Sequence, residues 1–165
     1  MADLNRPAEP KSFLEEPRKL PEMINVLTIL TFIGSGLGII GSLWGFSSAK
    51  KAYEQMSTMS MEQLPDFAKR MMGNDPVEAA RRTLEYRLPI LLINLVAIAL
   101  CIYGATEMRK LKKTGFTMYA IGEILPIAGA LIFLGSAATG TTYYISYCIS
   151  IVFVVLYASQ LKYLR

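Results

Sequence analysis

The stretch FIGSGLGIIGSLWGF, from Phe32 to Phe46, contains five glycines and two serines among apolar residues and carries no charge. Glycine costs about 1 kcal/mol relative to alanine in a water-soluble helix, whereas in a bilayer small residues let helix backbones approach closely. The stretch lies inside the charge-free segment 23–49. Because about 20 apolar residues cross a bilayer core as a helix, we predict a membrane-spanning helix over residues 23–46.

Two further charge-free segments, 88–106 and 124–161, extend this pattern. The second segment is long enough for most of two spans, and its least hydrophobic part, GSAATGTT, offers two glycines for a turn. Together with the residues before it, this segment divides into spans near 115–134 and 143–161. The sequence therefore predicts an all-α integral membrane protein, a bundle of four transmembrane helices over residues 23–165. Such long charge-free stretches are not expected in a water-soluble helical core.

The hydrophilic parts of the chain differ in character. Residues 1–22 contain four prolines and charges of both signs, and such a composition cannot bury enough apolar area to fold alone. We predict a flexible tail there. Segment 47–87, between the first two spans, has apolar residues at helical spacing and is predicted to be a helical loop. Within it, Gly73 is expected to end one helix, and Asp75 with Pro76 to begin the next.

The orientation in the membrane depends on a short basic hairpin, EMRKLKKTG, between the second and third predicted spans. Lys and Arg accumulate in cytoplasmic loops, so the hairpin predicts that both termini are cytoplasmic and that loop 47–87 lies on the other side. Three basic residues of that loop, Lys50, Lys51 and Arg87, lie close to the spans and oppose this assignment. The side on which the loop lies stays open.

Four glycines of the first span form a candidate helix-packing face. Gly34, Gly38, Gly41 and Gly45 follow one another at intervals of four, three and four residues, which places them on one side of a helix. This face either contacts another subunit or, in the interpretation we favour, packs against the other spans of the same chain. In both cases a bulky residue at Gly38 is expected to destabilise the protein more than one at Ile39.

Glu123 is the one ionisable residue predicted to lie within a span, near the middle of the bilayer. A charge there costs about 2.5 to 3.5 kcal/mol on insertion scales. Candidate polar partners are Asn94 in the second span, Ser146 and Ser150 in the fourth, and the backbone carbonyl that Pro126 frees one turn earlier. Thr28 and Thr31 in the first span and Tyr147 in the fourth are further candidate partners. These residues form either a structural hydrogen bond between helices, which we favour, or a proton- or ion-responsive site or polar ligand pocket.

Several kinds of function are not expected. The net charge is +4, but most basic residues flank spans, so no nucleic-acid partner is predicted. The sequence contains no histidine, which removes the commonest general base and metal-binding nitrogen. Cys101 and Cys148 fall inside predicted spans, where free thiols are expected. We predict no catalytic residue, no metal site and no cofactor.

The methionines of the loop offer a surface for contacts. Methionine-rich faces bind hydrophobic partners adaptably, although we favour a small helical cap over the bundle. The five methionines concerned are Met56, Met59, Met61, Met71 and Met72.

Two blocks of sequence, VLTILTFIGSG in the first span and RKLKKTGF at the basic hairpin, resemble segments of small, uncharacterised four-span bacterial inner-membrane proteins. The resemblance implies a bacterial inner-membrane location and no activity. The leading prediction is a non-enzymatic structural or accessory subunit that binds another membrane protein or a second copy of itself within the lipid bilayer. The alternative is a transporter or channel component in which Glu123 is an intramembrane polar site.

Overall fold

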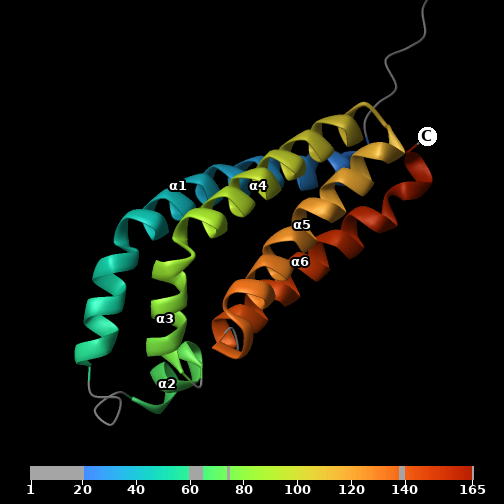
Figure 1. The fold of residues 1–165 in the computed structure, drawn as a ribbon. Helices are drawn as coiled ribbons and strands as arrows, with labels where there is room; N and C mark the ends of the chain where they lie inside the picture. The colour runs from blue at the N-terminus through green and yellow to red at the C-terminus, as the bar shows by residue number, and fades with distance from the viewer. Residues whose placement is uncertain (1–20, 60–64, 74, 138–139, 165) are drawn as a thin grey trace, which may run out of the picture.

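The computed structural model describes residues 21–59, 65–73, 75–137 and 140–164, and within these ranges it contains helices and turns but no strand (Figure 1). Four helices are long and apolar enough to cross a membrane. They are α1 (Glu22–Thr58), α4 (Arg87–Arg109), α5 (Lys113–Phe133) and α6 (Thr141–Ser159). The predicted all-α fold with four spans is thus confirmed, and the composition of the helices indicates an integral membrane protein. Residues 1–20 of the predicted tail lie outside the described ranges.

The long helices run up and down between two ends of the molecule (Figure 1). At one end, here called the hairpin end, the turn between α4 and α5 lies near the start of α1 and the C-terminus. The opposite end, the cap end, holds the last turns of α1 and two short helices, α2 (Asp66–Met72) and α3 (Pro76–Glu85). Two 3₁₀ turns, η2 (Gly135–Ala137) and η3 (Leu161–Tyr163), follow α5 and α6.

Helix α1 is longer than the predicted span, because it continues unbroken through residues 47–58. This extension contains alanine, lysine, glutamate and glutamine, which favour helix, and no glycine or proline. With 37 residues, α1 is about 55 Å long at about 1.5 Å per residue. Since a bilayer core is about 30 Å thick, α1 projects beyond it, and α3 packs beside the projecting part.

The helix boundaries predicted in the loop are confirmed. Gly73 ends α2 with φ 91°, and the Asp75 side chain caps α3 by accepting a hydrogen bond of 3.0 Å from the backbone N–H of Glu78. Pro76 occupies the first turn of α3, where its missing N–H leaves no hydrogen bond unmade. Tyr86 then separates α3 from α4.

The best-buried core lies toward the hairpin end. Its largest fully buried side chains include Tyr119 of α5 and Tyr157 of α6, whose ring centroids are 4.5 Å apart. The Tyr157 hydroxyl shares a 2.8 Å hydrogen bond with Thr31 of α1. At the cap end, Thr141 donates to the carbonyl of Arg70 at 2.9 Å. Helix α6 is therefore hydrogen-bonded to its neighbours near both ends.

Helices α4 and α5 approach most closely where glycine faces glycine. A Cβ atom added to Gly104 would lie 2.6 Å from the carbonyl oxygen of Gly115, and one added to Gly115 would lie 2.6 Å from that of Gly104. One more glycine, Gly122, leaves so little space that a Cβ would lie 2.7 Å from the Sγ of Cys101. The two backbones are thus in direct contact.

The turn from α4 to α5 is a Schellman motif that uses leucine at the left-handed position. Leu111 has φ 60°, and its N–H bonds to the carbonyl of Met108 at 2.9 Å, while the N–H of Lys112 bonds to that of Glu107 at 3.2 Å. The Glu107 carboxylate, nearly buried, pairs with the ammonium groups of Lys110 at 2.6 Å and Lys112 at 3.0 Å. This carboxylate raises the pKa of Lys110.

Candidate intramembrane polar site

Glu123 lies half-buried on α5, one turn beyond Tyr119. The Tyr119 hydroxyl donates a 2.7 Å hydrogen bond to Oε1 of Glu123. Tyr119 is only 1% exposed, so its hydroxyl is held firmly in place by the core. Within the described residues, none of the ion pairs involves Glu123. Its carboxyl group is therefore oriented by one donor on its own helix and is not neutralised by a Lys or Arg.

Two cavities meet at Glu123. The hairpin-side cavity, about 280 Å³, lies among α1, α4, α5 and α6. The cap-side cavity, about 270 Å³, lies among α3, α4, α5 and α6. Glu123, Pro126 and Ser150 line both cavities. The carboxyl-bearing residue thus stands at the common boundary of two open spaces.

The cap-side cavity brings together all four residues of the predicted polar site. Asn94 reaches it from α4, Glu123 from α5, and Ser146 and Ser150 from α6. Tyr147 lines it as well, and the hydroxyl oxygen of Tyr147 is buried without a hydrogen-bond partner among the described residues. With Thr83 and Tyr143, which also line it, a carboxyl, an amide and five hydroxyl-bearing side chains surround one space.

Pro126 affects the backbone at the boundary of the cavities. Helix α5 continues through it, but proline has no N–H, so the carbonyl of Gly122 lacks its usual helical donor. Gly122 and Pro126 both line the hairpin-side cavity. This carbonyl adds an acceptor near Glu123, as predicted for a proline at this position.

Of the four glycines in the predicted packing face of α1, Gly38 comes nearest to another helix, α4 of the same chain. A Cβ on Gly38 would lie 3.2 Å from the Cδ1 of Ile98, whereas one on Gly34, Gly41 or Gly45 would meet nothing within 4 Å. Gly34 lines the hairpin-side cavity, while Gly41 and Gly45 line a third cavity of about 140 Å³ between α1 and the junction of α3 and α4. These glycines leave space beside α4.

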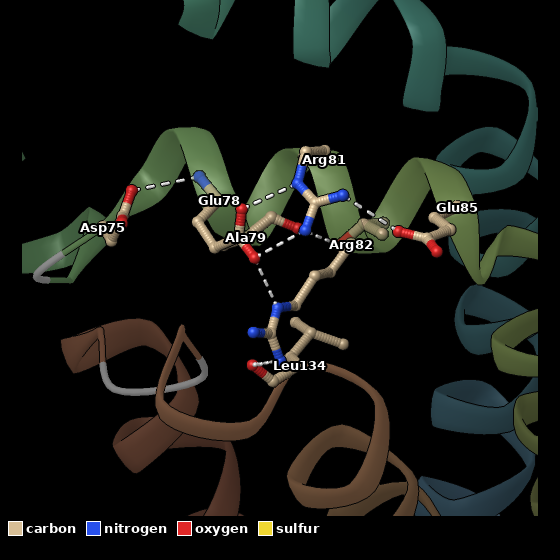
Figure 2. Close-up of polar contacts among 8 residues, drawn as sticks. Asp75, Glu78, Ala79, Arg81, Arg82, Glu85 and Leu134 are labelled. Atoms are coloured by element: carbon tan, nitrogen blue, oxygen red, sulfur yellow. Dashed lines mark hydrogen bonds and ion pairs between the residues drawn. The ribbon is translucent and has the colours of Figure 1, made fainter.

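Helix α3 covers the cap end of the site. Thr83 of α3 lines the cap-side cavity, and the neighbouring Arg82 reaches from α3 to the carbonyl of Leu134, at the end of α5, at 3.4 Å (Figure 2). Arg82 Nε also donates to Glu78 Oε1 at 2.7 Å. Hydrogen bonds from Arg81, and then from Arg82, lower the pKa of Glu78 from 4.5 to about 2. The Glu78 carboxylate thus holds both arginines, and Glu85 also pairs with Arg81 at 3.1 Å.

Tyr119, Thr83 and Tyr143 are among the contributors to the site that were not predicted. Tyr119 lies four residues before Glu123, and this helical spacing is the signal that would have identified it. Thr83 belongs to the loop, and no pattern in the sequence indicates that α3 folds over the cavity. Thr28 of α1, a predicted partner of Glu123, does not bond to it and donates to the carbonyl of Asn25 at 3.0 Å.

The groups gathered at this site can bind a ligand. A carboxyl group, an amide and hydroxyl groups hold cations and hydrogen-bond donors. Among the described residues no cluster of three His, Cys, Asp or Glu side chains could hold a metal ion. Cys101, buried in α4, and Cys148, exposed on α6, are free thiols. A scan of the chain against protein-family models and searches of curated proteins and of solved structures found no match.

Proposed function

We propose that this chain is a non-enzymatic component of a membrane transporter or channel, and that it binds a cationic or hydrogen-bond-donating solute at Glu123. The observation that carries the proposal is the position of Glu123 between two cavities, with no cationic partner among the described residues. A carboxyl group inside a bilayer is costly, and such residues commonly mark pathways for solutes or ions.

The hydrogen bond of Glu123 supports this function over a purely structural role. A residue that joins helices bonds across them, whereas Glu123 accepts from Tyr119 on the same helix. That bond contributes nothing to holding α5 against α1, α4 or α6. The carboxyl group also faces space instead of packed side chains. A bound solute would supply the missing interaction.

The test is flux through proteoliposomes that contain the full chain. Movement of protons, Na⁺, K⁺ and a small organic ammonium ion is measured for the wild type, for Glu123→Gln and for Glu85→Gln. Glu85 provides the matched control because the same change there falls on α3, outside the spans. We expect Glu123→Gln to abolish flux and Glu85→Gln to preserve it. Equal flux in both variants, or wild-type liposomes no leakier than empty ones, would contradict the proposal.

The proposed location is a bacterial inner membrane with both termini in the cytoplasm. The basic residues of the hairpin support this orientation, since the start of α1 and the C-terminus share their end of the molecule. The orientation is tested by labelling intact cells with a membrane-impermeant maleimide. Each variant carries one cysteine, in place of Lys112 or Lys51, in a chain without Cys101 and Cys148. Labelling at Lys51 alone is expected, and labelling at Lys112 alone would reverse the orientation.

A second candidate function is an accessory subunit, and an apolar groove of the cap favours it. This groove, about 420 Å³, contains Met56, Met71 and Phe67, and Phe67 is 68% exposed. Exposed methionine and aromatic side chains suit an adaptable protein contact. Native mass measurement in a mild detergent tests this function: a stoichiometric complex that Phe67→Glu dissociates would support it, and a monomer in both cases would exclude it.

A further inference from the structure

We propose that the cap-side cavity binds a protonated organic amine with a compact apolar body. This inference rests on the proposed function and names the class of solute for the site at Glu123.

The polar part of the cavity offers several hydrogen-bond acceptors, and its amide and hydroxyl groups can also donate. Glu123 offers carboxylate oxygens, Asn94 an amide oxygen, and Ser146 and Ser150 hydroxyl oxygens. Tyr147 adds a buried hydroxyl that has no partner among the described residues. An ammonium group carries several N–H donors and one positive charge, so it satisfies these oxygens and neutralises Glu123 together.

The remaining lining is apolar and aromatic. Apolar area predominates over polar area in this cavity, and the aromatic ring of Tyr143 stands among the aliphatic side chains. The aliphatic residues are Ile90, Ile93, Ile127, Ala130 and Leu134. Such a wall matches a hydrocarbon body attached to the ammonium group, and a tyrosine ring attracts a cation placed over its face.

The same lining disfavours two other classes of solute. A bare Na⁺ or divalent ion needs about six or more oxygen ligands at close range, and a cavity of about 270 Å³ with this apolar wall does not provide such a cage. An anion would require a positive group, yet the described lining contains no lysine or arginine. A small amphiphilic cation fits both the charge and the volume.

The experiment is equilibrium binding of benzylammonium, at neutral pH, to the full chain in detergent, measured by calorimetry. Benzyl alcohol serves as the neutral probe of the same shape, and Na⁺ and K⁺ serve as the inorganic cations. We expect benzylammonium to bind and benzyl alcohol to bind at least about 10-fold more weakly, because it lacks the charge that Glu123 recognises.

Variants show whether the residues of the cap-side cavity, and not other residues, determine benzylammonium binding. Glu123→Gln is expected to weaken benzylammonium binding by more than about 30-fold, and Tyr147→Phe by about 3- to 10-fold. Ser35→Ala is the matched control, since Ser35 lines only the hairpin-side cavity and should leave binding unchanged. Glu123→Asp keeps the charge and should retain part of the affinity, which distinguishes loss of the site from loss of the fold.

The outcomes also separate this inference from the proposed function. Equal binding of benzylammonium and benzyl alcohol, or binding unaffected by Glu123→Gln, would overturn the inference. Flux or binding of inorganic cations that depends on Glu123, without amine binding, would overturn the inference and leave the proposed function standing. If no probe binds and no flux depends on Glu123, both proposals fail.

Discussion

Two helix pairs in this molecule use glycine in opposite ways. Between α4 and α5, Gly104 faces Gly115, and an added Cβ on either would lie 2.6 Å from backbone atoms of the other helix. Between α1 and α4, Gly38 faces the side chain of Ile98, and its neighbours Gly34 and Gly41 face open space. The first pair is in backbone contact, whereas the second pair encloses cavities.

The difference follows from the size of the opposing side chain. Glycine opposite glycine removes both Cβ atoms, so the backbones meet. Glycine opposite isoleucine lets the large side chain fill one position, and the helices stay apart on either side of it. A face of small residues therefore allows two arrangements, and the residue across the interface decides which one forms.

The largest expected effect comes from closing the space in the tight interface. Gly104→Ala should destabilise the fold by about 1 to 3 kcal/mol, because the new methyl group can be accommodated only if α4 and α5 move apart. Thermal unfolding of the protein in detergent measures the loss. Gly41→Ala is the matched control, since nothing lies within 4 Å of its added Cβ. Equal losses at the two positions would break the comparison.

An intermediate effect is expected where glycine opposes isoleucine. Gly38→Leu should cost about 1 kcal/mol, less than Gly104→Ala, because the atom it meets is the flexible end of Ile98 and cavities lie beside it. Ile39→Leu, on the exposed side of α1, should change stability little. The same unfolding assay ranks the variants, and a larger loss for Ile39→Leu would contradict the assigned face.

A smaller effect, of opposite sign, is expected at the turn that joins the tight pair. Leu111 holds φ 60°, a conformation that costs an L-residue about 1 to 2 kcal/mol. Leu111→Gly should therefore stabilise the protein slightly, by at most about 0.5 kcal/mol, because the extra chain entropy of glycine and the lost contact of the leucine with the core offset part of the gain. Ser136→Gly, at an exposed residue of another turn, is the control. A lower melting temperature for Leu111→Gly would show that the leucine side chain matters more than the strain.

The smallest effect concerns the cap above the looser pair. The pKa of Glu78 is about 2 in the folded protein and 4.5 as its ordinary value. Its contribution to stability is therefore complete above pH 4.5 and is lost as the pH falls from 4.5 toward 2. The contribution is small because the side chains of Glu78 and Arg81 are solvent-accessible. As the pH is lowered from 4.5 toward 2, the melting temperature of Glu78→Gln should fall less steeply than that of the wild type. Parallel curves for the two proteins would show that Glu78 does not contribute to the pH dependence of stability.

Much of this architecture could be predicted from local patterns. Runs of uncharged residues define the four spans, and Gly73, Asp75 and Pro76 mark helix boundaries, since both signals depend only on neighbouring residues. The placement of Asn94 and Ser146 in one cavity with Glu123 was also predicted, because a polar group inside a bilayer is less costly next to other polar groups than next to lipid.

What the sequence did not reveal depends on which helix faces which. The contact of Gly104 with Gly115 requires the rotation of α4 against α5, and the cavities beside Gly34 and Gly41 require the position of Ile98. The reach of Arg82 to Leu134 spans 52 positions in the chain, and no periodic pattern encodes such a pairing. Side-chain size across an interface, not spacing along one helix, determines these features.

The unbroken length of α1 has a mechanical consequence. One continuous helix carries Thr31 and Ser35 on the wall of the hairpin-side cavity and Ala52 and Met56 in the groove of the cap. Helix α1 bends between these points (Figure 1) but is not interrupted, so a displacement of the cap acts on the same helix that forms the cavity wall. A partner bound in the groove of the cap, outside the bilayer, would thus change the shape of the cavity beside Glu123.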